Sequence, residues 1–188
     1  MDQAKIGAAL FVFLAVPPVA RFMESVMVLH MHMQMPLLVV AGLLMAPFVQ
    51  KRFPGAFERW NPTGIPGILL FAWISCFWLL PRAMDEALTI PGMEIFKFAS
   101  LPFLAGIPLR DSWRKLGAKG QKWVVGFFAA VFMGMGLLYI FAPVRLCNNY
   151  LEIEQLALGW GFVFTAAGMI VYLVYSALVA PAEYEETS

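Results

Sequence analysis

Val26–Val49 reads VMVLHMHMQMPLLVVAGLLMAPFV, a run of 24 residues without a charged side chain. A helix needs about 20 mainly apolar residues to cross the hydrocarbon core of a bilayer. Two histidines and one glutamine are the only strongly polar residues in the run, and all three lie in its first half. We therefore predict a transmembrane helix over residues 26–49.

The rest of the chain is equally apolar. Of its 188 residues, 61% are hydrophobic and 13% are charged, and the mean hydropathy is +0.76. A soluble domain carries about 25% charged and about 45–50% apolar residues, and a chain of this length has too little interior to hide the excess. The composition predicts an all-α, polytopic membrane helix bundle and excludes the soluble, disordered and disulfide-scaffold classes.

Six apolar segments are candidate spans, and together they form a single integral membrane domain over residues 1–188. They cover residues 6–20, 26–49, 65–80, 92–109, 123–142 and 156–179. The fourth is the weakest because it contains Glu94, Lys97 and two prolines, so five helices remain an alternative. The first resembles a signal peptide, since Lys5 precedes a short apolar run. No clean cleavage site follows, and we expect it to be retained.

The basic residues predict the orientation of these spans. With the N-terminus inside, nine of the 13 Lys and Arg fall on the cytoplasmic side, three fall outside, and Lys97 lies within the fourth span. Cytoplasmic loops of membrane proteins carry such an excess of Lys and Arg. We predict a six-helix bundle in the cell inner membrane, with both termini inside.

Methionine and histidine gather in one short segment. Residues 23–35 read MESVMVLHMHMQM and hold five of the twelve methionines and both histidines. At 100° per residue, four side chains fall within about 60° of one another on one face of the helix: Met23, Met27, His30 and Gln34. His32 points almost the opposite way, and Pro36 is expected to kink the helix because it lacks an N–H. In the predicted topology this segment lies on the outer side.

The residue types of this segment fit a soft metal ion. Thioether sulfur is a soft, neutral ligand that favours Cu(I), and Glu24 could help to close a site at the outer end. The candidate ligands are Met23, Met27, His30, Met31, His32, Met33 and Met35. Methionine is also an adaptable packing residue, so packing stays open as the alternative to a copper site.

Other polar residues give weaker signals. Glu94 and Lys97 are three residues apart and can pair on one helix face, or Lys97 can extend to the outer interface. Alternatively, Glu94 joins Asp85 and Glu86 in an acidic outer mouth. Cys76 falls inside a span and Cys147 outside one, so we expect no disulfide. No phosphate-binding loop, dinucleotide fingerprint or zinc-protease motif occurs, and the chain is not expected to be an enzyme.

Two further patterns concern packing. Small residues at four-residue spacing, Gly126-Ala130-Gly134 and Ala157-Gly161-Thr165, predict close packing of the fifth and sixth helices. Tryptophans near the proposed boundaries are expected to act as interfacial anchors: Trp60, Trp78, Trp113, Trp123 and Trp160.

Several of these stretches resemble a known family. Residues 77–88, FWLLPRAMDEAL, resemble the tryptophan–histidine–x–proline…aspartate–x–alanine–leucine stretch of the caa3-type cytochrome oxidase assembly factors. Residues 30–35 with Pro47 resemble that family's histidine–methionine helix, and residues 103–106 resemble its small-residue stretch. The resemblance covers residues 25–110, and the matching positions are His30, Met31, Trp78, Pro81 and Asp85.

The resemblance implies a polytopic protein that helps to deliver copper to a haem–copper oxidase. Two departures matter, because Leu79 and Gln34 stand where the family has histidine. Either the metal site has changed from histidine to methionine, or the chain binds no metal. We therefore carry two hypotheses: copper handling on the periplasmic side, for an oxidase or another copper enzyme, and a metal-free structural or accessory subunit of a respiratory or oxidoreductase complex. Neither involves nucleic acid.

Overall fold

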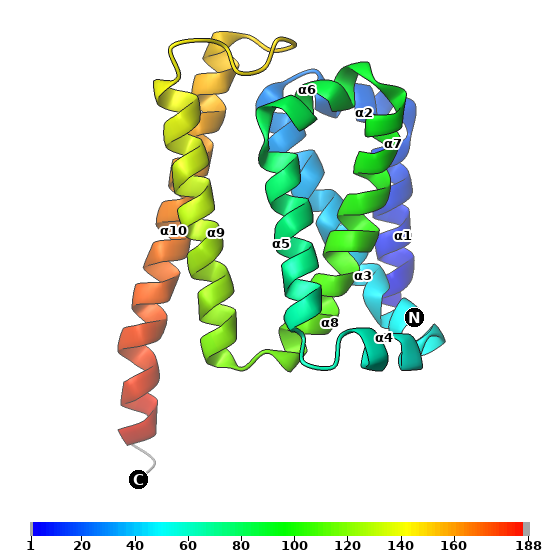
Figure 1. The fold of residues 1–188 in the computed structure, drawn as a ribbon, viewed down its shortest axis with the longest axis vertical. Helices are drawn as coiled ribbons and strands as arrows, with labels where there is room; N and C mark the ends of the chain where they lie inside the picture. The colour runs from blue at the N-terminus through cyan, green and yellow to red at the C-terminus, as the bar shows by residue number, and fades with distance from the viewer. Residues whose placement is uncertain (1, 186–188) are drawn as a thin grey trace.

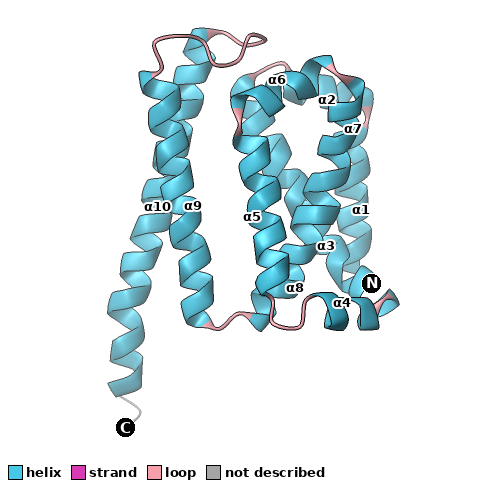
Figure 2. Cartoon of the chain, viewed as in Figure 1, coloured by secondary structure: helices cyan, strands magenta, loops and turns pink. Residues whose placement is uncertain are grey.

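The computed structural model describes residues 2–185, with side chains described for residues 2–179. Within that range the chain is helical, with short turns and no strand (Figures 1 and 2). The helices are α1 (Asp2–Ala15), α2 (Pro17–Glu24), η1 (Leu29–Gln34), α3 (Met35–Arg52), α4 (Pro54–Trp60), α5 (Ile65–Leu79), α6 (Pro81–Thr89), α7 (Pro91–Ser100), η2 (Leu101–Gly106), α8 (Ile107–Lys115), α9 (Ala118–Phe141) and α10 (Glu152–Glu185). The two labelled η are π-helical, with hydrogen bonds that reach five residues back.

Several helices are long and apolar enough to cross a membrane. Four stretches qualify by themselves: Leu29–Arg52, Pro91–Lys115, Ala118–Phe141 and Glu152–Val179. Two bent pairs qualify together: Asp2–Ala15 with Pro17–Glu24, bent by 70°, and Pro54–Trp60 with Ile65–Leu79, bent by 86°. The described chain is therefore an all-helical membrane protein with four such stretches, or up to six if each bent pair counts as one.

The helices form two groups that lie side by side. Helices α1 to α8 make a bundle, and α9 and α10 make an antiparallel hairpin beside it (Figure 1). We call one end of the molecule the basic end, because the end of α3, α4 and α8 carry there Lys51, Arg52, Arg59, Arg110, Arg114 and Lys115. The other end, formed by α2, α6 and residues 142–151, is called the loop end.

Prolines set most of the helix boundaries. Val16 precedes Pro17 and is extended, with φ −62° and ψ 126°, because the proline ring disfavours the helical conformation of the residue before it. The span predicted over residues 6–20 is therefore two helices with a 70° bend rather than one straight helix. Leu80 is extended before Pro81 for the same reason, and it ends α5 at Leu79.

Pro36 and Pro108 each lie directly after a π-helical turn that accommodates the proline. The Met35 N–H donates to the His30 carbonyl, five residues back, and the helix continues through Pro36 as α3. The Ile107 N–H bonds to the Pro102 carbonyl in the same way. A wider turn makes room for a proline ring that would otherwise clash with the preceding carbonyl. The expected effect of Pro36 thus takes the form of η1.

Glycine contacts fix how the helices pack. A side chain at Gly42 of α3 would overlap the backbone of Pro102 in η2, so these two elements are in backbone contact. Between α9 and α10 the close approach is at Gly136 and Gly159, where an added Cβ would lie 2.9 and 3.0 Å from the opposite carbonyl oxygen. Close packing of this pair was predicted at other small residues: a Cβ added at Gly126 would lie 3.7 Å from Leu173 of α10, whereas nothing lies within 4 Å of one added at Gly134.

Candidate functional site

A buried ammonium group lies near the loop end of the bundle. The Lys97 side chain is 0% exposed. Its Nζ donates to Glu24 Oε1 at 2.5 Å and to Gln34 Oε1 at 3.3 Å, and it lies 3.0 Å from His30 Nε2. An ammonium has three hydrogens, so all three have an acceptor. These residues, together with Tyr150, are called the loop-end network.

The hydrogen bonds of Tyr150 determine which nitrogen of His30 carries the proton. The Tyr150 hydroxyl donates to the Glu24 carbonyl at 2.8 Å, and His30 Nδ1 lies 2.8 Å from the same hydroxyl oxygen. Because the single hydroxyl hydrogen is already used, His30 Nδ1 must be the donor to Tyr150. His30 Nε2 then carries no proton, and its lone pair accepts a hydrogen bond from Lys97. The His30 ring is therefore neutral.

Five residues from four separate parts of the chain build this network. Glu24 ends α2, His30 and Gln34 lie in η1, Lys97 lies in α7, and Tyr150 follows α9. The predicted partners of Lys97 are wrong, because its ion pair is with Glu24 rather than Glu94, and its side chain does not reach the interface. Helical spacing finds partners on the same helix, whereas this side chain points into the bundle. Glu24, which was expected to help close a site at the outer end, instead pairs with Lys97.

The structure divides the predicted ligand set between different surroundings. Met27, Met31 and Met35 are buried, whereas Met33 is 47% exposed on the outer surface and Met23 is half-buried. Both ring nitrogens of His30 are occupied, one by Tyr150 and the other by Lys97. Within the described side chains, no three His, Cys, Asp or Glu residues form a group that could hold a metal ion. Methionine sulfurs are therefore the ligands left to consider.

Four buried sulfur atoms share one core cluster at the loop end. Their residues come from three parts of the chain, the segment before α3, helix α6 and the loop after α9, and we call them the sulfur cluster: Met27, Met31, Met84 and Cys147. Tyr139 of α9 belongs to the same core and donates from its hydroxyl to Met31 Sδ at 3.8 Å. Sequence spacing along one helix could not identify this group, because Met84 and Cys147 arrive from α6 and the loop after α9.

Asp85 holds the loop that carries Cys147. Its carboxylate accepts from the backbone N–H and the side-chain amide of both Asn148 and Asn149, at 2.8 to 3.2 Å. The Cys147 thiol points inward and lies 3.7 Å from the Pro81 carbonyl oxygen. Burial, with the nearby Asp85 charge, raises the pKa of Cys147 to about 11, so the thiol is protonated at neutral pH. Cys76 and Cys147 form no disulfide, as predicted.

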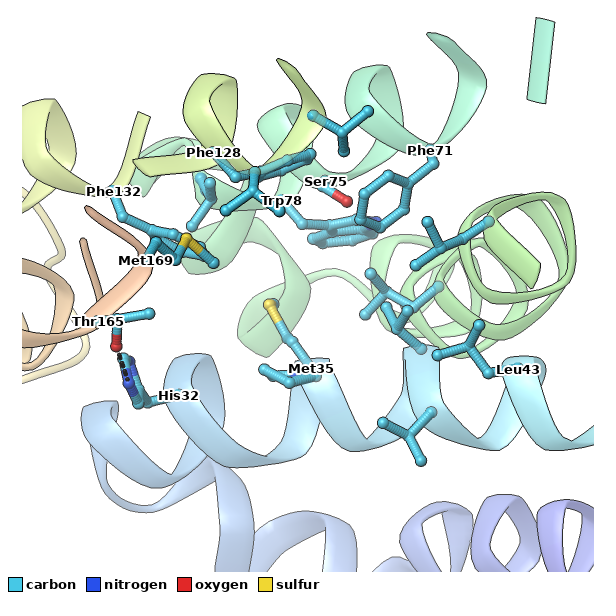
Figure 3. A pocket seen from close by; sticks show the side chains of 18 of the residues that line it. His32, Met35, Leu43, Phe71, Ser75, Trp78, Phe128, Phe132, Thr165 and Met169 are labelled. Carbon is cyan, nitrogen blue, oxygen red and sulfur yellow. Dashed lines mark hydrogen bonds between the residues drawn. The ribbon is translucent and has the colours of Figure 1, made fainter. Parts of the chain in front are cut away.

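His32 faces the hairpin rather than the loop-end network. Its Nε2 lies 3.0 Å from Thr165 Oγ1 on α10, and its ring lies 5.4 Å from the ring of Phe162 (Figure 3). The Thr165 hydroxyl also donates to the Gly161 carbonyl at 2.9 Å. His32 and Met35 line a cavity between the bundle and the hairpin. The two histidines thus serve different surfaces, as their predicted opposite directions implied.

Trp78, one of the positions that carry the family resemblance, has a structural role. It is buried rather than interfacial, and its Nε1–H donates to Ser100 Oγ at 2.8 Å. Trp78 therefore ties α5 to α7 three residues beyond Lys97. The prediction that Trp78 is an interfacial anchor is wrong, because its ring packs into the same core as Met31 and Leu101.

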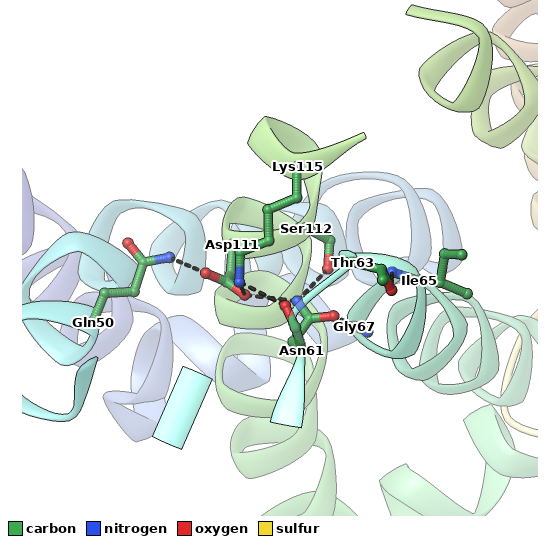
Figure 4. A network of polar contacts seen from close by, with 8 residues as sticks. All are labelled: Gln50, Asn61, Thr63, Ile65, Gly67, Asp111, Ser112 and Lys115. Atoms are coloured by element: carbon green, nitrogen blue, oxygen red, sulfur yellow. Dashed lines mark hydrogen bonds and ion pairs between the residues drawn. The ribbon is translucent and has the colours of Figure 1, made fainter. Parts of the chain in front are cut away.

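A second polar network lies at the basic end (Figure 4). Asn61, at the bend between α4 and α5, donates to Asp111 Oδ2 at 2.6 Å and to Ser112 Oγ at 2.9 Å. Its side-chain oxygen accepts from the Gly67 N–H at 3.0 Å. The bend is completed by Gly64, whose φ of +80° favours glycine. Asn61 thereby fixes the start of α5 against α8.

Two further residues complete this basic-end network. Lys115 Nζ donates to Asp111 Oδ2 and to the Asn61 carbonyl, both at 2.7 Å, and Gln50 Nε2 donates to Asp111 Oδ1 at 3.0 Å. Sequence reasoning missed this network and the role of Tyr150. The available signal was Asn61 before Pro62 in a polar break, which is typical of a turn but does not identify the residues that Asn61 contacts.

No family model, curated protein or solved structure matches this chain.

Proposed function

We propose that the chain crosses the bacterial inner membrane six times, with the basic end in the cytoplasm and the loop end in the periplasm. The support is the distribution of charge between the two ends. Six Lys and Arg residues lie on α3, α4 and α8 at the basic end, whereas Arg21, Arg82 and Arg145 lie toward the loop end. In this arrangement α1 begins and α10 ends on the cytoplasmic side.

We propose further that the protein handles Cu(I) at the loop end and assists the assembly or metallation of a haem–copper oxidase or another copper enzyme. The observation that carries this proposal is the sulfur cluster, whose three thioethers and one thiol are all buried in the same hydrophobic core, with the thiol in the loop held by Asp85. Thioether sulfur binds Cu(I) without first losing a proton and binds hard cations poorly. The resemblance of residues 25–110 to oxidase assembly factors also supports a role in copper handling.

The proposal moves the ligands from a helix face to this cluster. His30 is replaced as a ligand because its nitrogens already bond to Lys97 and Tyr150. Met27 and Met31 remain from the predicted set, and Met84 and Cys147 join them. Copper would pass to a partner subunit by exchange of one thioether for another, so the chain would need no covalent chemistry.

Anaerobic loading with Cu(I), followed by gel filtration and metal analysis, tests the proposal. We expect stoichiometric copper in the wild-type chain, with X-ray absorption dominated by sulfur neighbours, and loss of copper in Met27→Leu/Met31→Leu. Methionine to leucine preserves volume and costs little stability. Met33→Leu is the matched control, because Met33 belongs to the same segment but lies on the outer surface. A wild-type chain without copper, or equal loading of all three chains, contradicts the proposal.

One observation favours the metal-free alternative, an accessory subunit of a respiratory or oxidoreductase complex. The Lys97 ammonium occupies the lone pair of His30, and a positive charge at that position repels a metal ion there. On this alternative the loop-end network is a structural centre, and no copper is retained. Co-purification with oxidase subunits at equal stoichiometry from membranes, without copper in the complex, is the result expected for that function.

A further inference from the structure

The cavity between the bundle and the hairpin has the form of a lipid-chain site. It is partly enclosed and has a volume of about 700 Å³, which is within the range of about 300–1,000 Å³ that is usual for ligand pockets. Figure 3 shows that α3, α5, α9 and α10 contribute its walls. Nearly all the lining side chains are apolar, including Leu43, Phe71 and Phe128.

The hairpin leaves this space because it contacts the bundle at few points. The rings of Phe71 on α5 and Phe128 on α9 lie 5.0 Å apart, and Thr165 on α10 meets His32. These contacts close the cavity on the α5 side and toward the loop end. An apolar cavity does not hold ordered water well, because water needs two to four polar partners. The natural occupant is an apolar group from the bilayer.

The cavity is elongated along the helices. Its lining runs along η1 and α3 from Met31 to Leu43, which is about 18 Å at 1.5 Å per residue. At its far end it reaches Arg110 and Trp113 of α8, at the basic end. A long slot parallel to the helices suits a single hydrocarbon chain better than it suits a compact ligand.

Arg110 gives the slot a charged mouth. The residue is exposed and lines the cavity, and within the described side chains it forms no salt bridge. Arginine binds phosphate through two parallel hydrogen bonds, and Trp113 beside it is of the type that lies at the headgroup level of a membrane. The Arg110 guanidinium therefore lies at the end of the slot, where the headgroup of a lipid would be if its acyl chain occupied the slot.

We propose that this cavity binds an anionic phospholipid, with one acyl chain in the slot and the phosphate at Arg110. The second chain stays in the bilayer through the open side of the cavity. This site is separate from the sulfur cluster, and the proposal does not depend on copper binding. It does rest on the membrane placement of the chain.

Native mass spectrometry of the full chain with added dioleoyl phosphatidylglycerol, dioleoyl phosphatidylcholine or palmitate tests the proposal. We expect the wild-type chain to retain phosphatidylglycerol about tenfold better than phosphatidylcholine, because the choline cation of phosphatidylcholine offsets the charge of its phosphate and is repelled by Arg110. Arg110→Gln should abolish this preference, whereas Arg114→Gln, on the same helix but not lining the cavity, should keep it. An unchanged preference in Arg110→Gln, or preferential retention of palmitate, overturns the proposal.

Two further measurements test whether the acyl chain of the lipid lies in the cavity. Val124→Trp fills the slot from α9 and should reduce lipid retention, whereas Val174→Trp on the exposed side of α10 should not. A phosphatidylglycerol with a photoactivatable acyl chain should label Phe71 and Phe128 in the unmodified protein, which keeps the test independent of how the variants fold. Labelling confined to the exposed faces of α9 and α10 overturns the proposal.

Discussion

The loop-end network and the basic-end network both bury polar side chains between helices, yet they are built differently. At the basic end, Asn61 bonds through its side-chain nitrogen, side-chain oxygen and carbonyl, and its partners lie on α5 and α8 (Figure 4). At the loop end, a completely buried Lys97 is held by Glu24 of α2 and by His30 and Gln34 of η1. In this second network, Gln34 Nε2 has no hydrogen-bond partner among the side chains and backbone that the structure describes.

The difference indicates which network fixes the fold and which one would lose more free energy if a partner of its buried charge were removed. The basic-end network satisfies the polar groups of a bend, where a buried backbone would otherwise lose hydrogen bonds. The loop-end network keeps a full charge out of water, which is costly unless the partner charge and every hydrogen bond are in place. We therefore expect the loop-end network to be the more sensitive to substitution of a single residue.

The largest effect is expected from Lys97→Met. It removes the only ion-pair partner that Glu24 has among the described side chains, and breaking a buried pair costs about 3–5 kcal/mol. The free energy of unfolding, measured by denaturant titration in mild detergent, should fall by that amount. Lys119→Met, on the exposed start of α9, is the control and should change little. A loss below about 1 kcal/mol would show that Glu24 is solvated or protonated and would remove the proposed contrast.

A smaller loss is expected from Asn61→Ala. The change leaves the Gly67 N–H and the Ser112 hydroxyl without their partner, and an unsatisfied buried group costs about 1–3 kcal/mol. The same titration measures it, with Thr63→Ala in the exposed part of the bend as control. Hydrogen exchange should rise at the start of α5 and stay unchanged around Lys97. Equal rises at both ends would mean that the two networks are one cooperative unit.

The smallest effect concerns pH and separates Cys147 from the other residues of the loop end. Its pKa is raised from 9.0 to about 11 in the folded chain, so the unfolded chain loses this proton first as the pH rises. Stability from this group is present below pH 9 and is lost between pH 9 and 11. Cys147→Ser should therefore lose less stability than the wild type over that interval. Parallel curves for the two chains would show that the thiol is not shielded.

Local sequence signals predicted much of the helical framework. The long apolar runs at residues 123–142 and 156–179 correspond to α9 and α10, and residues 65–80 correspond to α5. The prolines also predicted where helices begin, because proline fits the first turn of a helix and excludes helical conformation before it. The bend at Val16 and the length of Pro91–Lys115 were not predicted, because hydropathy measures apolar length and not direction.

The candidate sites were predicted less well. The methionine–histidine segment is part of the loop-end network, the sulfur cluster and the cavity, but its periodicity could not assign each residue to one of them. Met84, Cys147 and Tyr150 lie 49 or more residues away from it in sequence. Their contacts arise from helices and loops that meet across the bundle. The periodicity of one helix cannot identify the residues of other elements that pack against it.

The sequence alone determined that this is an apolar helical protein of the membrane, because the free energy of burying apolar surface depends on composition and run length. It also determined a sided charge pattern and a methionine-rich segment with two histidines that point in opposite directions. The tertiary structure decided that Lys97 pairs with Glu24, that His30 is neutral and already bonded, and that His32 lines a cavity. Hydrogen bonds act over about 3 Å and need defined directions, and only the packed helices set those distances.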